Sequence, residues 1–428
     1  MTAVRIPGRN GPVDAVVNVP GSKSVANRAL LCAALVESAT VSRVSNVPGG
    51  DDCLAMVAAL ESCSAMTGES VKGGVFPGSS VSFHAGIAGT TSRFLTAASC
   101  LSPGPVVIDG GEPLRRRPMG DLHDALRALG ARVVQHGGSE TGHLPVSVGR
   151  GSLSGGTVSV RGDVSSQFIS SLMLLAPRLP GGLVINVEGE LVSRPYVEMT
   201  AQVMRSFGAD VTFGAGSVAV GETPYRSVDY GVEPDYSSAA FAVMSLAFTE
   251  GRITVPGLAD AAMQGDSYVL EIARMMGLSV GVSGRDVTVT RDTGVLLSPV
   301  RVNLADASDL VPAVAVACTA IEGHSSISGV GFIRAKESDR LGDLADELNR
   351  AGASVEVTAD GLEIQGGRGH LPHGRFATHH DHRLAMAFAL IAGGGTSVEI
   401  EDAEVVTKSW PTYFRDMSGV LGPVEQLN

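Results

Sequence analysis

The sequence has few aromatic residues, no closely spaced cysteine pair and no long hydrophobic run. Aromatic residues make up 4% of the 428 residues, and Trp410 is the one tryptophan, so we expect no surface that stacks nucleic-acid bases. No hydrophobic run reaches the roughly 18 residues that span a bilayer. The five cysteines include no CxxC motif, which is typical of a reducing compartment. With no signal-peptide core at the N-terminus, the sequence predicts a cytoplasmic protein without membrane association.

Basic residues are also in the minority. The chain has 32 Lys and Arg residues against 44 Asp and Glu residues, a formal net charge of −12. Nucleic-acid-binding proteins usually carry a basic excess, so we expect no nucleic-acid partner. Any anion must therefore be held by a local cluster of Lys and Arg. The 44% hydrophobic and 18% charged content is typical of a folded protein, long enough here for two domains.

Glycine is abundant, with 54 residues, and some of these glycines mark an internal repeat. Each copy reads as a helix that ends at a glycine and runs into two alternating strands, because glycine tolerates the left-handed helix cap. The predicted turns lie at Gly130, Gly208, Gly277 and Gly352. A degenerate copy without the glycine, DDCLAMVAALESCSAM, precedes them. The repeat predicts compact α/β units, with a domain break near 231–234 and an N-terminal strand at about 4–19 that belongs with the second half.

Several short motifs place Lys, Arg or Ser where a helix is expected to begin. The first turn of a helix has free backbone N–H groups and a partial positive charge, and both favour an anion. Each motif alone also fits an ordinary helix cap or a surface ion pair. Together they indicate a multiply anionic ligand. The motifs are PGSKS at 20–24, AGTTSR at 88–93, RRRP at 115–118, SSQF at 165–168, AKESDR at 335–340 and DHR at 381–383.

Three of these motifs carry more specific expectations. In RRRP, Pro118 would occupy the first helical position, behind three arginines. In AKESDR, Lys336 and Arg340 would lie one helical turn apart on one face. The run HHDHR at 379–383 resembles a metal site, but neighbouring histidines on a loop rarely converge without a distant ligand. We therefore favour an anion-binding helix start there, and we expect no metal and no cofactor.

Taken in order, the motifs PGSKSxxNR, AGTxxR, RRRP, SSQF, SRPY, SDLVP, KESDR, DHR and KSWP resemble the EPSP synthase family of 3-phosphoshikimate 1-carboxyvinyltransferases. The resemblance runs from about Pro20 to Pro411. It implies two similar α/β domains, each of three βαβαββ repeats in an inside-out α/β barrel, with the active site in the interdomain cleft. The domains would comprise 1–19 plus 234–428, and 20–233.

The resemblance also implies a reaction, in which the enolpyruvyl group of phosphoenolpyruvate passes to the 5-hydroxyl of shikimate 3-phosphate, in the shikimate pathway of aromatic amino-acid biosynthesis. Asp309 would accept a proton, Glu337 would donate one, and Lys23 would assist at the leaving phosphate. The implied shikimate 3-phosphate site comprises Lys23, Ser24, Arg28, Ser165, Ser166, Gln167, Ser193, Asp309 and Lys336. The implied phosphoenolpyruvate site comprises Lys23, Gly89, Arg117, Gln167, Arg340, Arg383 and Lys408. The family is the target of glyphosate, and we expect a monomer whose partners are these small substrates.

The chain departs from the family pattern at Ile87, Phe94, Phe332 and Val405. A related transferase acts on UDP-N-acetylglucosamine, but it usually carries Lys-Asn early and a reactive cysteine on a loop. Here the early motif is Lys23-Ser24, and the loop GGEPLRRRPMG at 110–120 has no cysteine. Two further classes of protein fit parts of the pattern, an RNA-end-processing protein and a non-catalytic sugar-phosphate binder. The acidic net charge and the few aromatic residues argue against the first of these.

Overall fold

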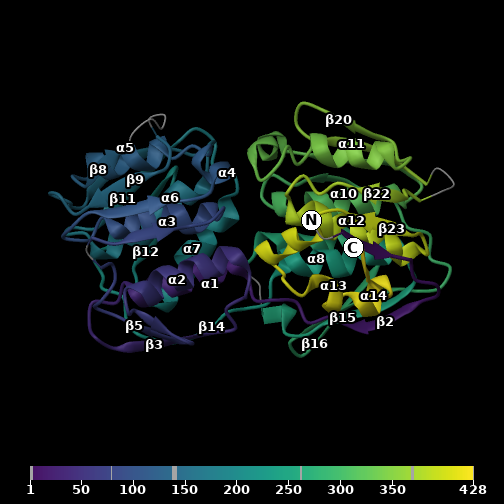
Figure 1. Ribbon diagram of the computed structural model, residues 1–428, viewed down its shortest axis with the longest axis horizontal. Coiled ribbons are helices and arrows are strands. Elements are labelled where there is room, and N and C mark those ends of the chain that lie inside the picture. The colour runs from purple at the N-terminus through teal and green to yellow at the C-terminus, as the bar shows by residue number, and fades with distance from the viewer. Residues whose placement is uncertain (1–2, 79, 137–141, 261–262, 368–370, 428) are drawn as a thin grey trace. The chain divides into compact units, whose positions relative to one another are not determined.

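The computed structural model describes residues 3–78, 80–136, 142–260, 263–367 and 371–427 (Figure 1). The chain divides into two compact units. Unit 1 comprises Met1–Pro20 with Glu233–Asn428, and unit 2 comprises Gly21–Val232. Each unit has its own hydrophobic core.

The strands of the described residues form six sheets of four strands, three in each unit. In unit 2 the sheets are β14(Asp229–Gly231)–β3(Val41–Ser45)–β5(Ser70–Lys72)–β4(Met66–Thr67), β6(Ser82–His84)–β7(Val106–Asp109)–β9(Val146–Gly149)–β8(Arg132–Gln135) and β10(Gly156–Arg161)–β11(Leu183–Glu188)–β13(Ser217–Val220)–β12(Val211–Gly214). In unit 1 they are β2(Val13–Val16)–β15(Gly251–Val255)–β17(Asp286–Arg291)–β16(Ser279–Ser283), β18(Arg301–Asn303)–β19(Gly323–Ser328)–β21(Leu362–Gly366)–β20(Val355–Val357) and β22(Gly374–Phe376)–β23(Val398–Ile400)–β1(Ala3–Ile6)–β24(Glu425–Leu427).

Every sheet has the same pairing pattern. Its first two strands are parallel and its last two pairings are antiparallel, as in β10 with β11, β11 with β13, and β13 with β12. A parallel pair needs a crossover, which a helix supplies, whereas an antiparallel pair needs only a short turn. The pattern is therefore that of a βαβαββ repeat.

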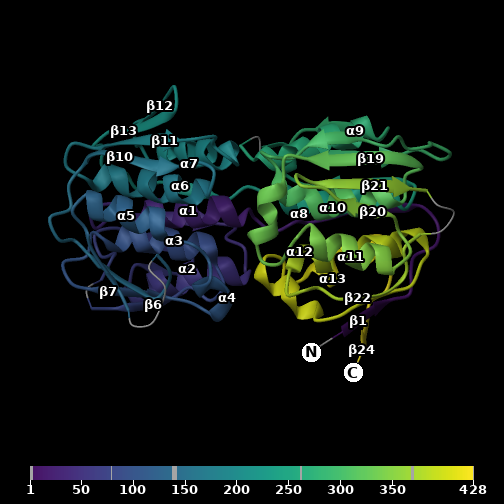
Figure 2. The same cartoon turned by 90° about the horizontal axis from the view of Figure 1, so that it is seen from above.

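Three largely buried helices lie inside each unit, within the described residues. They are α1(Lys23–Ala34), α3(Gly89–Ser99) and α6(Ser166–Leu175) in unit 2, and α8(Tyr236–Met244), α10(Val311–Thr319) and α12(His382–Ala389) in unit 1. Segments such as LAMAFA in α12 are hydrophobic on all sides, which suits full burial. Figures 1 and 2 show sheets on opposite sides of these helices in each unit. This arrangement, with helices inside and strands outside, confirms the predicted fold class.

The second helix of most repeats is amphipathic and ends at a left-handed residue. Helices α5(Gly120–Ala128), α7(Arg194–Ser206), α9(Val269–Met275) and α11(Gly342–Arg350) each have exposed and buried faces. The predicted turn glycines after them have φ of 88°, 89°, 96° and 98°, and a strand follows each. After α2(Asp51–Ser62), Ser64 takes the left-handed conformation with φ of 57°. All four predicted glycine turns are confirmed.

The predicted single strand at about 4–19 is wrong. The segment forms β1 and β2, which belong to different sheets of unit 1. Gly8 and Gly11 between them have φ of 99° and 84°, which an extended strand cannot contain. Strand β1 pairs with both β23 and the C-terminal strand β24.

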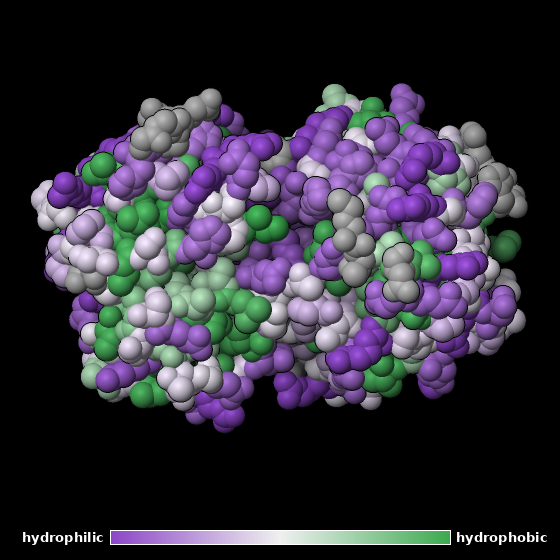
Figure 3. Space-filling model, viewed as in Figure 1, coloured by the Kyte–Doolittle hydropathy of each residue, from purple (hydrophilic) through white to green (hydrophobic). Residues whose placement is uncertain are grey.

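No helix of the described residues combines the length and the hydropathy that a membrane crossing requires. Figure 3 shows hydrophobic residues interspersed with hydrophilic ones on one face of the molecule. Large exposed hydrophobic side chains include Val41 and Phe213 in unit 2 and Val282 in unit 1.

Candidate substrate and catalytic sites

The first turns of several helices meet in unit 2. Arg28 on α1 donates to the Tyr196 carbonyl (3.2 Å) in the first turn of α7, to Thr200 Oγ1 (2.7 Å) in the middle of that helix, and to Ser170 Oγ (3.4 Å) on α6. Arg93 on α3 donates to Ser165 Oγ over 3.5 Å and to Gln167 Oε1, at the start of α6. These contacts join the N-terminal ends of α1, α3, α6 and α7. They gather the predicted residues Lys23, Ser24, Arg28, Gly89, Ser165, Ser166, Gln167 and Ser193 at those ends.

Three of these helix starts, those of α1, α3 and α7, leave their backbone N–H groups without a side-chain cap. Ser22 precedes α1 and Ala88 precedes α3, and neither side chain makes a capping hydrogen bond. By contrast, Ser165 caps α6 by accepting from the Gln167 N–H over 3.3 Å. Uncapped first turns next to basic side chains are suited to an anion.

Arg28 is a buried cation, with 1% of its surface exposed. It donates to hydroxyl and carbonyl oxygens, including the Ser24 carbonyl at 2.7 Å, and its guanidinium carbon lies 5.2 Å from the Phe94 ring centroid. Burial lowers the pKa of Arg28 to about 10. Phe94, one of the positions where the sequence analysis found a departure from the family pattern, therefore forms part of the environment of a predicted site residue.

Lys23 pairs with an acid that the sequence analysis did not select. Its Nζ lies 2.8 Å from Asp52 Oδ2, and the two side chains are 20% and 10% exposed. The Asp52 carbonyl in turn accepts from Thr91 Oγ1 over 2.7 Å. Asp51 and Asp52 in the first turn of α2 are explained by their favourable interaction with the helix dipole. The sequence alone therefore did not indicate that Asp52 pairs with Lys23.

Gly89, Arg117 and Gln167 lie together. A Cβ added at Gly89 would be 2.9 Å from Arg117 Nη1 and 3.8 Å from Gln167 Oε1. The absence of a side chain at Gly89 thus lets the Arg117 guanidinium approach the first turn of α3. Arg93, to which the sequence analysis assigned no role, fixes Gln167 from the other side, although it lies in the AGTTSR motif.

The expectation that Pro118 occupies the first helical position is wrong. Helix α5 begins at Gly120, so Pro118 is not its first residue. Arg115 ends the short helix α4(Glu112–Arg115) and pairs with Asp109 at 2.6 Å, and Arg116 pairs with Glu112 at 3.3 Å. Pro113 instead lies in the first turn of α4, and residues 116–119 separate the two helices. Of the three arginines, Arg117 is the one that reaches Gly89.

In unit 1, Arg340 holds several of the predicted residues together. Its side chain is 1% exposed and donates to Asp309 (Nη1, 3.0 Å), Glu337 (Nη2, 2.7 Å) and Asp381 (Nε, 2.8 Å). Burial alone would lower the pKa of Arg340, but these carboxylates outweigh burial and raise it above the usual arginine value. The cation is therefore permanent.

Asp309 and Glu337 each have a second cationic partner. Arg383 Nη2 lies 2.7 Å from Asp309 Oδ2, and Lys408 Nζ lies 2.6 Å from Glu337 Oε1. Asp309 lies in η5(Ser308–Leu310), just before α10, and Arg383 lies in the first turn of α12, which Asp381 caps. Lys408 ends η8(Ala403–Lys408). The segment before α10 thus supplies the carboxylate of Asp309, and the first turn of α12 supplies the cation of Arg383.

The expected helix start at AKESDR is wrong. Residues 331–335 form the 3-10 helix η6, and α11 begins only at Gly342. Asp339 Oδ1 accepts from the N–H of Gly342, the first residue of α11, over 3.0 Å, so the acid lies before the helix and not within it. Lys336 and Arg340 are not one helical turn apart; Lys336 Nζ lies 5.9 Å from the Phe332 ring centroid.

The histidines of HHDHR point to different partners. His379 lies 3.2 Å from Glu347, and His380 is exposed and lies 4.0 Å from Asp402. His382 is buried beside Asp381, at 3.6 Å. Across the part of the chain that the structure describes, no group of three or more His, Cys, Asp or Glu side chains is placed to hold a metal ion.

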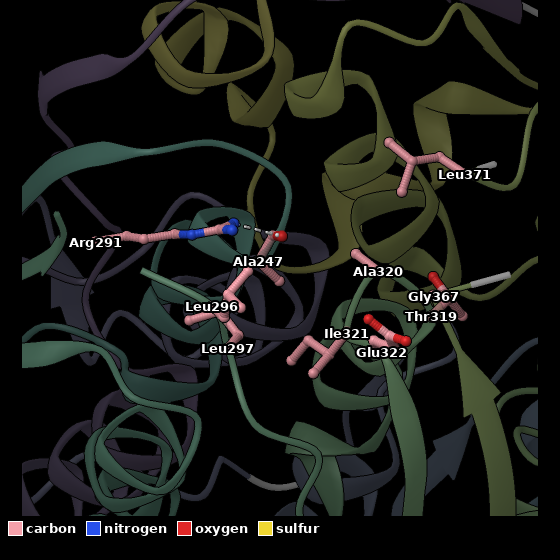
Figure 4. Close-up of a pocket in the computed structure, with 10 residues that line it drawn as sticks. All are labelled: Ala247, Arg291, Leu296, Leu297, Thr319, Ala320, Ile321, Glu322, Gly367 and Leu371. Carbon is pink, nitrogen blue, oxygen red and sulfur yellow. Dashed lines mark hydrogen bonds between the residues drawn. The ribbon is translucent and has the colours of Figure 1, made fainter. Parts of the chain in front are cut away.

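A pocket of about 560 Å³ lies elsewhere in unit 1 (Figure 4). Leu296, Leu297, Ile321 and Leu371 line it. Arg291, its basic residue, donates to the Ala247 carbonyl over 3.0 Å and to the Leu246 carbonyl, so its guanidinium caps the helical turn η2(Ser245–Ala247). None of the predicted catalytic or substrate-binding residues lines this pocket.

Comparison with solved structures shows that this is the fold of enolpyruvyl transferases. EPSP synthase from Acinetobacter baumannii superposes with a TM-score of 0.83 at 24% identity, over 100% of both chains. The enolpyruvyl transferase NikO from Streptomyces tendae gives 0.79 at 17% identity, over 100% of this chain and 99% of that one. At such identities the likeness establishes the fold alone.

Sequence comparison is more specific. The family model described as EPSP synthase (3-phosphoshikimate 1-carboxyvinyltransferase) matches residues 8–417, so the chain belongs to this family. The relative of that name from Methanothermobacter thermautotrophicus is 39% identical over 411 residues, 95% of each chain. That from Methanoculleus marisnigri is 37% identical over 423 residues, 96% of this chain and 98% of the relative. The resemblance drawn from the ordered motifs is confirmed.

Proposed function

We propose that this chain transfers the carboxyvinyl group of phosphoenolpyruvate to the 5-hydroxyl of shikimate 3-phosphate and releases phosphate. One structural observation supports the proposal in addition to family membership. Asp309 and Glu337 are bound to the same buried guanidinium, and each has a second cation, Arg383 or Lys408. A reaction that moves two protons beside anionic substrates needs this combination of paired carboxylates and fixed positive charge.

In the addition step the 5-hydroxyl oxygen bonds to C2 of phosphoenolpyruvate, and C3 gains a proton to become a methyl group. The hydroxyl proton needs an acceptor. Arg340 and Arg383 stabilise the negative charge of Asp309, which suits an acceptor that is ionised at rest. We assign that role to Asp309.

Glu337 is assigned as the group that protonates C3 and later takes a proton back as phosphate leaves. In this structure Arg340 and Lys408 both stabilise negative charge on Glu337, which does not suit a resting acid. A bound phosphoenolpyruvate would compete for the same two cations. Once they turn to its carboxylate and phosphate, Glu337 can hold a proton, so substrate binding itself prepares the donor.

The residues of unit 2 are assigned to substrate binding. The uncapped first turns of α1 and α3, with Lys23 and Arg117, suit phosphate and carboxylate groups. Ser24, Ser165, Ser166 and Gln167 offer hydroxyl and amide groups for the sugar-like ring. Ser193 precedes α7 with a left-handed backbone, at φ of 56°.

The experiment that tests the proposal is phosphate release from phosphoenolpyruvate with either shikimate 3-phosphate or UDP-N-acetylglucosamine as acceptor. Turnover is expected with shikimate 3-phosphate alone, and it should persist in excess chelator. Turnover with UDP-N-acetylglucosamine would replace the proposed acceptor. Binding of shikimate 3-phosphate without turnover would leave a non-catalytic sugar-phosphate binder.

We also propose that the enzyme works as a monomer in the cytoplasm. Cys32, Cys53, Cys63, Cys100 and Cys318 are all free thiols, which fits a reducing compartment. Sedimentation of the active enzyme tests the oligomeric state, and a dimer at assay concentrations would contradict it.

A further inference from the structure

A buried carboxyl group lies behind the proposed proton acceptor. Asp266, in η4(Gly265–Tyr268), is 3% exposed. Ser237 Oγ, in the first turn of α8, donates to Asp266 Oδ2. The other oxygen, Oδ1, is enclosed and has no hydrogen-bond partner among the described residues. An enclosed oxygen left without a hydrogen-bond partner destabilises the folded chain, and more so if it is charged.

Three charged groups act on Asp266: Asp309 in η5, Asp235 at the cap of α8, and Arg383 in α12. Helix α9 also packs against η4, but its charged residues Glu271 and Arg274 are exposed and pair with each other at 3.3 Å. Burial, and then the negative charge of Asp309, raise the pKa of Asp266 to about 7, against the opposing effects of Ser237 and Arg383. The carboxyl group therefore changes charge near neutral pH instead of staying ionised as a surface aspartate does.

The same electrostatic relation acts on Asp309, because the interaction between two titrating groups is reciprocal. While Asp266 is protonated, Asp309 is the one negative charge of this pair, and Arg383 lies 2.7 Å from it. When Asp266 ionises, a second buried negative charge faces Asp309, and Arg383 is shared between the two. Asp309 then holds a proton more strongly and becomes a stronger base.

We propose that Asp266 is a positioning residue for the reaction, which sets the proton affinity of Asp309 through the buried contact region formed by η4, η5 and the start of α8. The inference rests on the role of Asp309 as proton acceptor. Asp266 exchanges no proton with substrate and touches no reacting atom; it acts through the charge that it places beside Asp309.

The first test compares kcat/KM of the wild type and Asp266→Asn from pH 5.5 to 8.5. Asparagine keeps the size of the side chain but stays neutral, and the ratio of the two enzymes cancels the ionisations of the substrates. The ratio should lie within about twofold of unity at pH 5.5 and rise by about fivefold or more at pH 8.5, with the change centred near 7. A ratio that does not vary with pH overturns the proposal.

Ser237→Ala is a second variant that preserves Asp266. The Ser237 hydroxyl favours the ionised carboxylate, so its removal should move the inflection to higher pH. Asp292→Asn, at an exposed position of the same unit, is the matched control and should leave the profile unchanged. A shift of the Ser237→Ala inflection to lower pH contradicts the proposed interaction.

The second test separates this inference from the assignment of Asp309. Carboxyl-carbon NMR of ¹³C-labelled aspartate follows the titration of Asp266 directly, in the wild type and in Asp309→Asn. The midpoint should fall in Asp309→Asn, because a like charge has been removed. An unchanged midpoint overturns the interaction, whereas a lowered midpoint in a variant that stays catalytically active overturns only the role of Asp309.

Discussion

Lys408 donates to Glu337 over 2.6 Å, with only 4% of the lysine side chain and 13% of the glutamate side chain exposed. A pair this enclosed is weakly screened by salt, and Arg340 adds a second cation at 2.7 Å. The two cations stabilise the ionised form of Glu337. Lys408 can bind a substrate anion only after it leaves this carboxylate. Under the proposed assignment of Lys408 to phosphoenolpyruvate, Glu337 therefore competes with this substrate for the lysine.

The first prediction follows from this competition. Glu337→Gln should lower kcat by about 10²–10⁴-fold, the usual effect of removing a general acid or base. The dissociation constant of phosphoenolpyruvate should stay equal or fall, because Lys408 and Arg340 lose a competing anion. Rapid kinetics with calorimetry measures both quantities. Glu322→Gln, at an exposed position of unit 1, is the control; a variant of Glu337 that retains more than about a tenth of kcat rules out its role.

The second prediction concerns Asp309. Asp309→Ala should also lose about 10²–10⁴-fold in kcat, with substrate dissociation constants changing much less, because Arg340 and Arg383 remain in place. The exposed neighbour Asp306 supplies the control variant Asp306→Ala. If Asp309→Ala keeps a tenth or more of the activity, Lys23 becomes the next proton carrier to test.

The repeat could be predicted from the sequence where glycine was obligatory. Gly130 and Gly352 have φ of 88° and 98°, a conformation that other residues rarely adopt. The sequence therefore shows a glycine between the helix pattern and the strand pattern of each copy. The copy after α2 uses Ser64 instead, with φ of 57°, which no glycine search finds. The last copy is divided between the chain ends: Gly422 precedes β24, which pairs with β1. Because the strands of this copy lie at opposite ends of the sequence, no local sequence pattern reveals the copy.

The candidate site could be predicted only in part, for a related reason. Motif order identified the cations and the carboxylates, because each lies in a short recognisable segment. It could not identify their partners. Lys23 and Asp52 are 29 residues apart, and Arg340 and Asp381 are 41 residues apart, so only the folded chain joins them. Residues 336–340 are not helical, although their charges have helical spacing, and Arg340 pairs instead with the distant acids Asp309 and Asp381.

The third prediction separates Arg117 from its neighbour. Arg117→Ala should raise the KM for phosphoenolpyruvate by about tenfold or more, because a charged hydrogen-bonding partner is removed from the first turn of α3. Arg116→Ala should change it less than about twofold, since Arg116 is exposed and pairs with Glu112 at the surface. Steady-state kinetics of the two variants measures the difference. Equal effects would show that the run of arginines acts only through its total charge.

The fourth prediction concerns Gly89. A methyl group there would lie 2.9 Å from Arg117 Nη1, so Gly89→Ala must displace the guanidinium by several tenths of an ångström. Glyphosate competes with phosphoenolpyruvate in this family and is the longer molecule. We expect Gly89→Ala to raise the inhibition constant of glyphosate more than the KM of phosphoenolpyruvate. Inhibition kinetics of both enzymes tests this, and equal increases would defeat the steric argument.

The last prediction uses a histidine outside the candidate sites. His123, on α5, is fully buried, and neither ring nitrogen has a hydrogen-bond partner among the described residues. Burial, and then Arg127, lower the pKa of His123 to about 4 in the folded chain, whereas the unfolded value is 6.5. The unfolded chain therefore binds the proton first. The stability contributed by neutral His123 is present above pH 6.5 and is lost as the pH falls toward 4.

His123→Phe removes this titration while keeping a ring in the core. Between pH 7.5 and pH 5 the wild type should lose about 2 kcal/mol more unfolding free energy than His123→Phe, from the difference between the folded and unfolded pKa values. Urea unfolding at several pH values measures the two slopes. His380→Asn is the control, because His380 is exposed and its left-handed backbone accepts asparagine. If the wild type and His123→Phe keep parallel pH dependences, His123 is not buried in its neutral form, and the acid sensitivity of unit 2 must come from its carboxylates.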